Sequence, residues 1–161
     1  MTVCSAADAA APLPQPLARA ILRRAEAVSG VRVDPARTEF VRLRVGRRLR
    51  ALGLADFEAY LSALEHDADG TEIRNLVEAL TTHTTSFFRE ARQYDWLAGP
   101  GLALLTGAQT GRPLTVWSAA CSLGAELWSA GIVLSESAAA PRDWWLIGSD
   151  ISTRVLRRAE A

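Results

Sequence analysis

Residues 114–129 read LTVWSAACSLGAELWS and combine a short apolar run with the start of a helix. The residue types at 114–120 are typical of a buried parallel strand, and a helix is expected to follow directly at 123–137. After a proline-containing break, a second strand is expected at 144–148 and another helix at 152–161. The order strand, helix, strand, helix predicts the beginning of a doubly wound α/β sheet.

The chain before this sheet predicts a small all-helical domain. Apolar residues recur there at helical spacing in four segments. Asp34 followed by Pro35 is typical of a helix start, and Thr71 is expected to cap the fourth helix. A cluster of hydroxyl residues after Thr81 then breaks the pattern before two short helices. The expected helices are 17–29, 34–53, 56–65, 71–80, 90–97 and 101–106.

Charge is strongly segregated along the chain, although the net charge is zero. Residues 16–50 hold ten Arg against three acids (+7), whereas residues 51–95 hold three Arg against nine acids (−6). All 18 basic residues are Arg, which reflects either genome composition or a demand for guanidinium geometry. Pattern and charge together divide the chain into a flexible leader at 1–15, a basic helical domain at 16–80, connecting helices at 81–112 and a partial α/β domain at 113–161.

Composition also excludes several classes of protein. No segment approaches the roughly 18 apolar residues that cross a bilayer, and the N-terminal residues lack the features of a signal peptide. We therefore expect a cytoplasmic protein without membrane insertion. Cys4 and Cys121 have neither CxxC spacing nor a nearby ligand cluster, so we expect reduced thiols and no metal site.

Two residues at the ends of the expected strands suggest a nucleotide site. Gly124 lies in the tight turn after the first strand, and Asp150 follows the second strand. In a nucleotide-binding βαβ unit, such a glycine lets the backbone approach the ligand, and such an acid accepts hydrogen bonds from ribose hydroxyls. Only one glycine is present where dinucleotide sites usually have GxGxxG. An ordinary strand-to-helix turn therefore remains the alternative.

Three stretches carry a more specific signal. They read LTTHTTSFFREARQYDWL at 80–97, VWSAACSLGAELWS at 116–129 and WWLIGSDISTRVLRRA at 144–159. In order and spacing they resemble signature blocks of the CheR-type chemotaxis receptor glutamate O-methyltransferases, which depend on S-adenosylmethionine. The resemblance runs from about residue 17 to 161 and implies a helical domain followed by the first half of a Rossmann-like sheet. Because family members continue with further strands, we expect this chain to be truncated after the second strand.

The resemblance implies a site for S-adenosyl-L-methionine built from all three stretches. It places Arg89 at the cofactor's methionine end as the catalytic residue, Glu126 at its amino group and Asp150 at its ribose. Read without the resemblance, Arg89 could form a solvated pair at a helix start, Glu126 could favour a helix N-terminus and Asp150 could cap the last helix. The expected cofactor-binding residues are His83, Thr85, Arg89, Glu126 and Asp150.

The sequence departs from the family pattern at several positions. His83 stands where the family usually has Asn, although it could still donate a hydrogen bond. Ala125 replaces the first Glu of the family's GEEPYS, and Leu127 with Trp128 replaces Pro-Tyr. Four other aromatic residues are expected in the core rather than at the cofactor: Phe87, Phe88, Trp117 and Trp145.

The resemblance implies methyl transfer to glutamate side chains of chemoreceptors, with the basic second helix docked on acidic receptor helices. An ordinary solvated helix face is the alternative for that helix. The 161 residues alone are expected to lack turnover, so the alternative function is a non-catalytic partner-binding module. Nucleic acid is not an expected partner because no aromatic interleaving accompanies the arginines. The expected docking residues are Arg37, Arg42, Arg44, Arg47 and Arg48.

Overall fold

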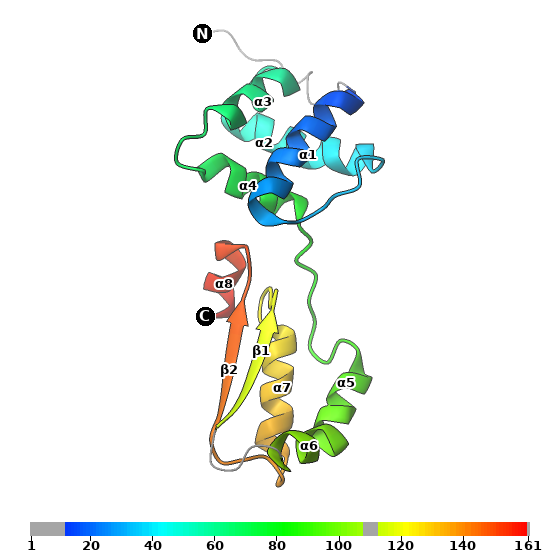
Figure 1. Cartoon of the computed structure of the whole chain (residues 1–161), viewed down its shortest axis with the longest axis vertical. Helices are drawn as coiled ribbons and strands as arrows, with labels where there is room; N and C mark the ends of the chain where they lie inside the picture. The colour runs from blue at the N-terminus through cyan, green and yellow to red at the C-terminus, as the bar shows by residue number, and fades with distance from the viewer. Residues whose placement is uncertain (1–11, 108–112, 161) are drawn as a thin grey trace. The chain divides into compact units, whose positions relative to one another are not determined.

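The computed structural model describes residues 12–107 and 113–160, which fall into two compact units (Figure 1). The boundary between the units lies between Thr82 and His83, and each unit has its own apolar core. Of the leader expected at 1–15, residues 1–11 lie outside the described residues. Within the described ranges, no helix has the length and apolar character needed to cross a membrane.

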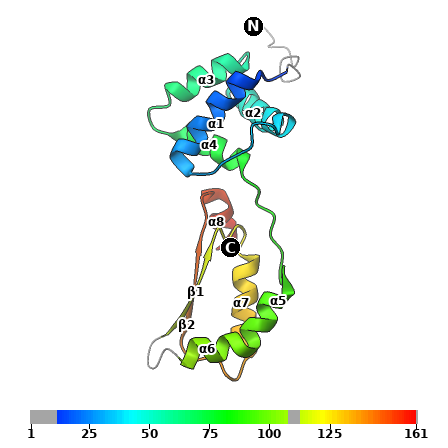
Figure 2. The ribbon, with the colours of Figure 1, turned by 45° about the vertical axis from the view of Figure 1, so that its right-hand side comes forward.

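The unit that begins at His83 is built around a parallel pair of strands. β1 (Leu114–Ala119) and β2 (Trp144–Ser149) pair with their first and last residues opposite each other. Between them runs α7 (Ala125–Glu136), the crossover that a parallel pair requires, and it lies along both strands in Figures 1 and 2. After β2 comes α8 (Thr153–Ala159). The expected order of strand, helix, strand and helix is confirmed.

The helices before β1 are joined rather than separate. α5 (Ala91–Trp96) continues through a π-helical turn, η2 (Leu97–Gly101), into α6 (Leu102–Gly107). Gly99 has non-helical backbone angles within this turn, and Pro100 lacks the N–H that a regular helix would use. The two helices expected here are therefore present, but a kink connects them.

One face of the two-stranded sheet carries large apolar side chains that remain exposed within the described residues. Side chains alternate along a strand, so Val116 and Leu146 face the packed side while Trp117 and Trp145 face the other. Trp117 is 66% exposed and Trp145 is 64% exposed. Their expected burial is therefore wrong for this chain, because no described element covers that face. The expectation of core positions is also wrong for Phe87 and Phe88, which are exposed.

The unit that precedes His83 is all-helical, as expected. Its helices are α1 (Gln15–Ser29), α2 (Thr38–Leu52), α3 (Phe57–Glu65) and α4 (Thr71–Leu80). All four contribute to one apolar core, because each is amphipathic and turns its apolar face inward. The fully buried side chains include Ile21, Val41, Tyr60 and Leu76, one from each helix.

Two expected helix starts differ from the structure. The carboxylate of Asp34 accepts the N–H of Ala36 at 2.8 Å, which forms a turn, and α2 begins only after that turn. Thr71 is the first residue inside α4, and Gly70 occupies the cap in a left-handed conformation. Asp69 accepts the N–H of Thr71 instead. Neither helix therefore begins with the side-chain cap that the sequence pattern predicted: Asp34 binds within the turn before α2, and Asp69 binds the first residue of α4.

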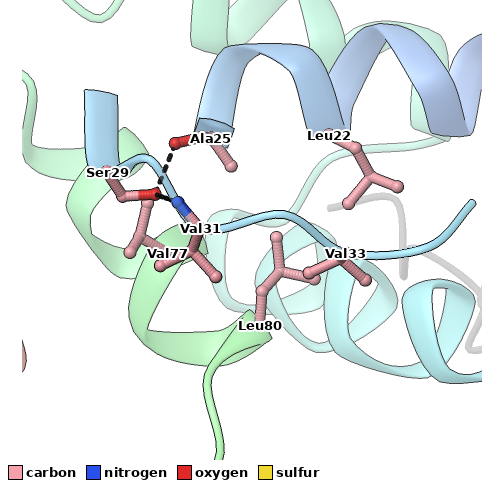
Figure 3. A pocket seen from close by; sticks show the side chains of 7 residues that line it. All are labelled: Leu22, Ala25, Ser29, Val31, Val33, Val77 and Leu80. Carbon is pink, nitrogen blue, oxygen red and sulfur yellow. Dashed lines mark hydrogen bonds between the residues drawn. The ribbon is translucent and has the colours of Figure 1, made fainter. Parts of the chain in front are cut away.

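The segment after α1 closes the core beside α4 (Figure 3). The hydroxyl of Ser29 donates to the carbonyl of Ala25 at 2.7 Å and accepts the N–H of Val31 at 3.1 Å. These bonds turn the chain so that Val31 packs near Leu80. The hollow between these side chains has no room for a water molecule. It is therefore part of the packed core and not a binding site.

A partly buried ion pair connects three helices of this unit. Arg48 on α2 donates two hydrogen bonds to the carboxylate of Glu72 on α4, at 3.0 and 2.7 Å. The hydroxyl of Tyr60 on α3 donates to the same carboxylate at 2.7 Å. Burial, together with the bond to Glu72, raises the pKa of the Tyr60 phenol well above its usual value. The carboxylate is thus fully used inside the domain.

We predict that Glu72→Ala lowers the free energy of unfolding of the helical unit by about 2 to 3 kcal/mol, because Arg48 and Tyr60 lose their shared acceptor. Glu65→Ala is the matched control, since it removes an exposed ion pair with Arg24 and should cost less than about 1 kcal/mol. Chemical denaturation of both variants, followed by circular dichroism, measures the difference. Equal losses for the two variants would contradict the prediction.

Candidate functional site

The turn after β1 is an unusual piece of backbone. Ala120, Ser122 and Gly124 all have positive φ, at 66°, 51° and 83°. Left-handed conformations are uncommon for residues that carry a Cβ, and they concentrate at functional sites. The N–H of Gly124 donates to the carbonyl of Cys121 at 2.8 Å, which closes the turn at the head of α7. The single glycine therefore serves a tight turn, as the sequence suggested.

Asp150 connects this turn with the one after β2. One carboxylate oxygen accepts the N–H of Ser122 at 2.9 Å, and the other accepts the N–H of Ser152 at 2.9 Å. The alternative in which Asp150 caps the last helix is wrong. Ser152 is the cap of α8, because its hydroxyl accepts the N–H of Val155. Asp150 instead fixes the two turns at the carboxyl ends of the parallel strands.

Glu126, in the first turn of α7, lies against two of the other expected cofactor residues. The hydroxyl of Thr85 donates a hydrogen bond to its carboxylate. The guanidinium of Arg89 lies 3.8 Å from the other carboxylate oxygen. Arg89 also donates to the carbonyl of Thr84 at 3.0 Å. The segment that carries Thr85 and Arg89 is therefore brought to the start of α7, about 40 residues later in the sequence.

The main chain of His83 is held at the same edge of the sheet. Its carbonyl accepts the hydroxyl of Ser122 at 2.9 Å. Ser122 therefore contacts both His83, at the start of the unit, and Asp150, after β2. Sequence reasoning did not identify Ser122 as a site residue. The only available signal was its position in the turn directly after an expected strand.

The buried Cys121, in the turn that follows β1, lies near the carboxylates of Asp150 and Glu126. Burial raises the pKa of its thiol, and the charges of Asp150 and then Glu126 raise it further. Both carboxylates therefore act on one point beside the turn.

The arginines expected to bind a partner lie in the helical unit and have different surroundings. Arg37 and Arg44 lie over the ring of Phe40, with 4.6 and 5.1 Å from the guanidinium carbon to the ring centre. Arg42 forms a bidentate pair with Glu39 on the same helix. Arg47 is exposed to solvent. Arg48 points into the domain, where it is bound to Glu72.

We predict that Asp150→Asn destabilises the second unit by about 1 to 3 kcal/mol without any ligand, because an amide offers one acceptor where two N–H groups need one each. Asp143→Asn, an exposed acid just before β2, is the control and should be neutral. Thermal unfolding of both variants gives the comparison. Unchanged stability in Asp150→Asn would show that the two bonds do not support the turns.

Comparisons with known proteins divide the chain at the same place as the two structural units, between residues 81 and 83. The all-alpha domain of CheR methyltransferases matches residues 18–81, and the SAM binding domain of the same methyltransferases matches residues 83–161. Chemotaxis protein methyltransferases of Salmonella typhimurium, Escherichia coli and Klebsiella aerogenes are 40%, 37% and 39% identical to this chain. Each match covers 83% of the chain. The chain spans 44 to 45% of the length of these relatives. With a helical and a cofactor domain both matched, and in the same order, the chain belongs to the CheR methyltransferase family.

Proposed function

We propose that this chain is the cofactor-binding part of a methyltransferase that acts on glutamate side chains of chemoreceptors. The family's domain binds S-adenosylmethionine, and residues 83–161 match that domain. The observation that carries the proposal is the cluster in which Thr85 and Arg89 meet the carboxylate of Glu126. Because the chain spans less than half of its relatives, the complete reaction is proposed for the whole protein.

The residues present fit the chemistry of S-adenosylmethionine. Its ammonium group needs a carboxylate, which Glu126 offers beside the hydroxyl of Thr85. Its carboxylate needs a cation, which Arg89 offers 3.8 Å from Glu126. Its ribose hydroxyls need an acceptor at the end of a second strand, where Asp150 lies. His83 begins the segment and is proposed to complete this set.

When bound, the cofactor supplies an electrophilic methyl group on a positively charged sulfur. The acceptor glutamate is already ionised at neutral pH, so no residue of this chain needs to act as a general base. The chain's own contribution is alignment of the two reactants and exclusion of water. Arg89 is the proposed catalytic residue. Its guanidinium can orient a carboxylate, either that of the cofactor or that of the acceptor glutamate, through two parallel hydrogen bonds.

The helical unit is proposed to bind the acidic helices of the receptor. Arg37 and Arg44 flank Phe40, and Arg47 is exposed on the same helix. Such a surface attracts acidic partners over long range and favours their rapid association. Arg42 belongs to the same proposed surface but shares its charge with Glu39. Arg48 contributes less, because its guanidinium is bound to Glu72 inside the unit.

A non-catalytic module that binds a partner through its basic helix is the second candidate. The observation that favours it is the basic surface of α2, where Arg37 and Arg44 lie over Phe40 and Arg47 is exposed. Both candidates predict docking, but only the first predicts binding of S-adenosylmethionine. Cofactor binding therefore separates them.

We predict that the 161-residue chain binds S-adenosylmethionine and S-adenosylhomocysteine in calorimetry, and that Glu126→Gln weakens binding by at least about tenfold. The cause is loss of the charge that pairs with the ligand's ammonium group. Glu136→Gln, at the exposed far end of the same helix, is the matched control and should bind normally. No heat and no thermal shift at millimolar ligand would refute cofactor binding. Normal affinity in Glu126→Gln would refute the role of that residue alone.

We predict that Arg44→Glu combined with Arg47→Glu weakens binding of a receptor cytoplasmic domain by about tenfold at low salt, with a smaller difference at high salt. Arg19→Glu combined with Arg23→Glu on α1 makes the same change in net charge on exposed positions and is the control. Pull-down at two salt concentrations measures both. If the two double variants lose equal affinity, net charge and not the α2 surface attracts the receptor.

A further inference from the structure

Ser129 is a fully buried polar residue that lies beside the cluster around Glu126. It follows Glu126 by three residues on α7, so both side chains lie on the same side of the helix. Its hydroxyl donates to the carbonyl of Ala125 at 2.7 Å and accepts the N–H of Phe88 at 2.9 Å. The bond to Ala125 is one that serine side chains commonly form with the carbonyl four residues earlier in a helix. The second connects α7 to a segment 41 residues earlier in the sequence.

The backbone around Arg89 needs such support. Phe88 has a φ of 52° and Glu90 has a φ of 59°, so Arg89 lies between two left-handed residues that both carry a Cβ. Conformations of this kind persist only where surrounding contacts determine them. The ring of Phe88 meets Tyr94 edge-on at 5.4 Å, and the hydroxyl of Tyr94 donates to the carbonyl of Glu126. The bond to Ser129 adds the direct contact to the main chain of Phe88.

We propose that Ser129 is a positioning residue that sets the guanidinium of Arg89 opposite the carboxylate of Glu126. It acts through the backbone: the N–H that Ser129 accepts belongs to the residue directly before Arg89. Fixing that peptide limits where the guanidinium can lie and leaves it 3.8 Å from Glu126. A site whose residues are held in place loses less freedom when a ligand binds. The proposed effect on cofactor affinity rests on the proposed function, whereas the effect on the Phe88 backbone does not.

The chain offers a matched control on the same helix. Ser135 also donates to the carbonyl four residues earlier, that of Gly131, at 2.8 Å, but its side chain is exposed. Ser129→Ala and Ser135→Ala therefore remove the same bond within α7. Only Ser129→Ala also removes an acceptor from the segment that carries Arg89. Ser129→Cys replaces the hydroxyl with a somewhat larger thiol that is a poor acceptor, and it is used if Ser129→Ala does not fold.

The first measurement is amide hydrogen exchange at Phe88 in the 161-residue chain without ligand. Ser129→Ala should speed exchange at this amide by about tenfold, the loss expected for one partly buried hydrogen bond, and Ser135→Ala should leave it unchanged. Unchanged exchange in Ser129→Ala overturns the proposal whether or not the chain binds cofactor. This result therefore stays distinct from a failure of the proposed function.

The second measurement is calorimetry with S-adenosylhomocysteine on a double-mutant cycle. Ser129→Ala should weaken binding about fivefold, and this loss should vanish when Arg89→Ala is already present, since the serine acts through that arginine. Ser135→Ala should bind like the parent chain. An equal loss in the presence and absence of Arg89 would show a general effect on α7 and overturn the proposal.

Discussion

The carboxylate of Asp150 joins the turns that follow β1 and β2, and the candidate site is built on this connection. One oxygen binds the N–H of Ser122 and the other that of Ser152. Ser122 in turn holds the carbonyl of His83, where the segment that carries Arg89 begins. A short series of hydrogen bonds therefore fixes three stretches of chain at one edge of the sheet. Without the carboxylate, the N–H groups of Ser122 and Ser152 would lose their acceptor, and the direct connection between the two turns would be lost.

Much of the fold could be predicted because its periodic signals are strong and local. Apolar spacing identified the helices of the first unit, and residue type identified both strands. The helix starts at Asp34 and Thr71 could not be placed, because Asp-Pro and hydroxyl residues suit a turn as well as a cap. The kink at Gly99 was missed for a related reason: a glycine and a proline end a helix or bend it.

The candidate site could be predicted only in part. Resemblance to a family supplied Thr85, Arg89 and Glu126, which the structure brings together. Ser122 and Ser129 escaped notice because their partners lie 39 and 41 residues away, and serine is common in turns and helices. Apolar character likewise predicted burial of the two exposed tryptophans on the sheet. Whether such a side chain is covered depends on which elements pack over it, which residue type does not reveal.

The pair between Arg48 and Glu72 has a consequence for the basic helix itself. Tied to α4 through two bonds, α2 cannot roll about its own axis without breaking them. The arginines on its outer face therefore have fixed positions relative to the helical unit. Contact with the ring of Phe40 restricts Arg37 and Arg44 further. Guanidinium groups that are already ordered lose less rotamer entropy when a partner binds than mobile ones would. The inward-facing Arg48 thus gives the outward arginines of α2 a fixed direction relative to the rest of the helical unit.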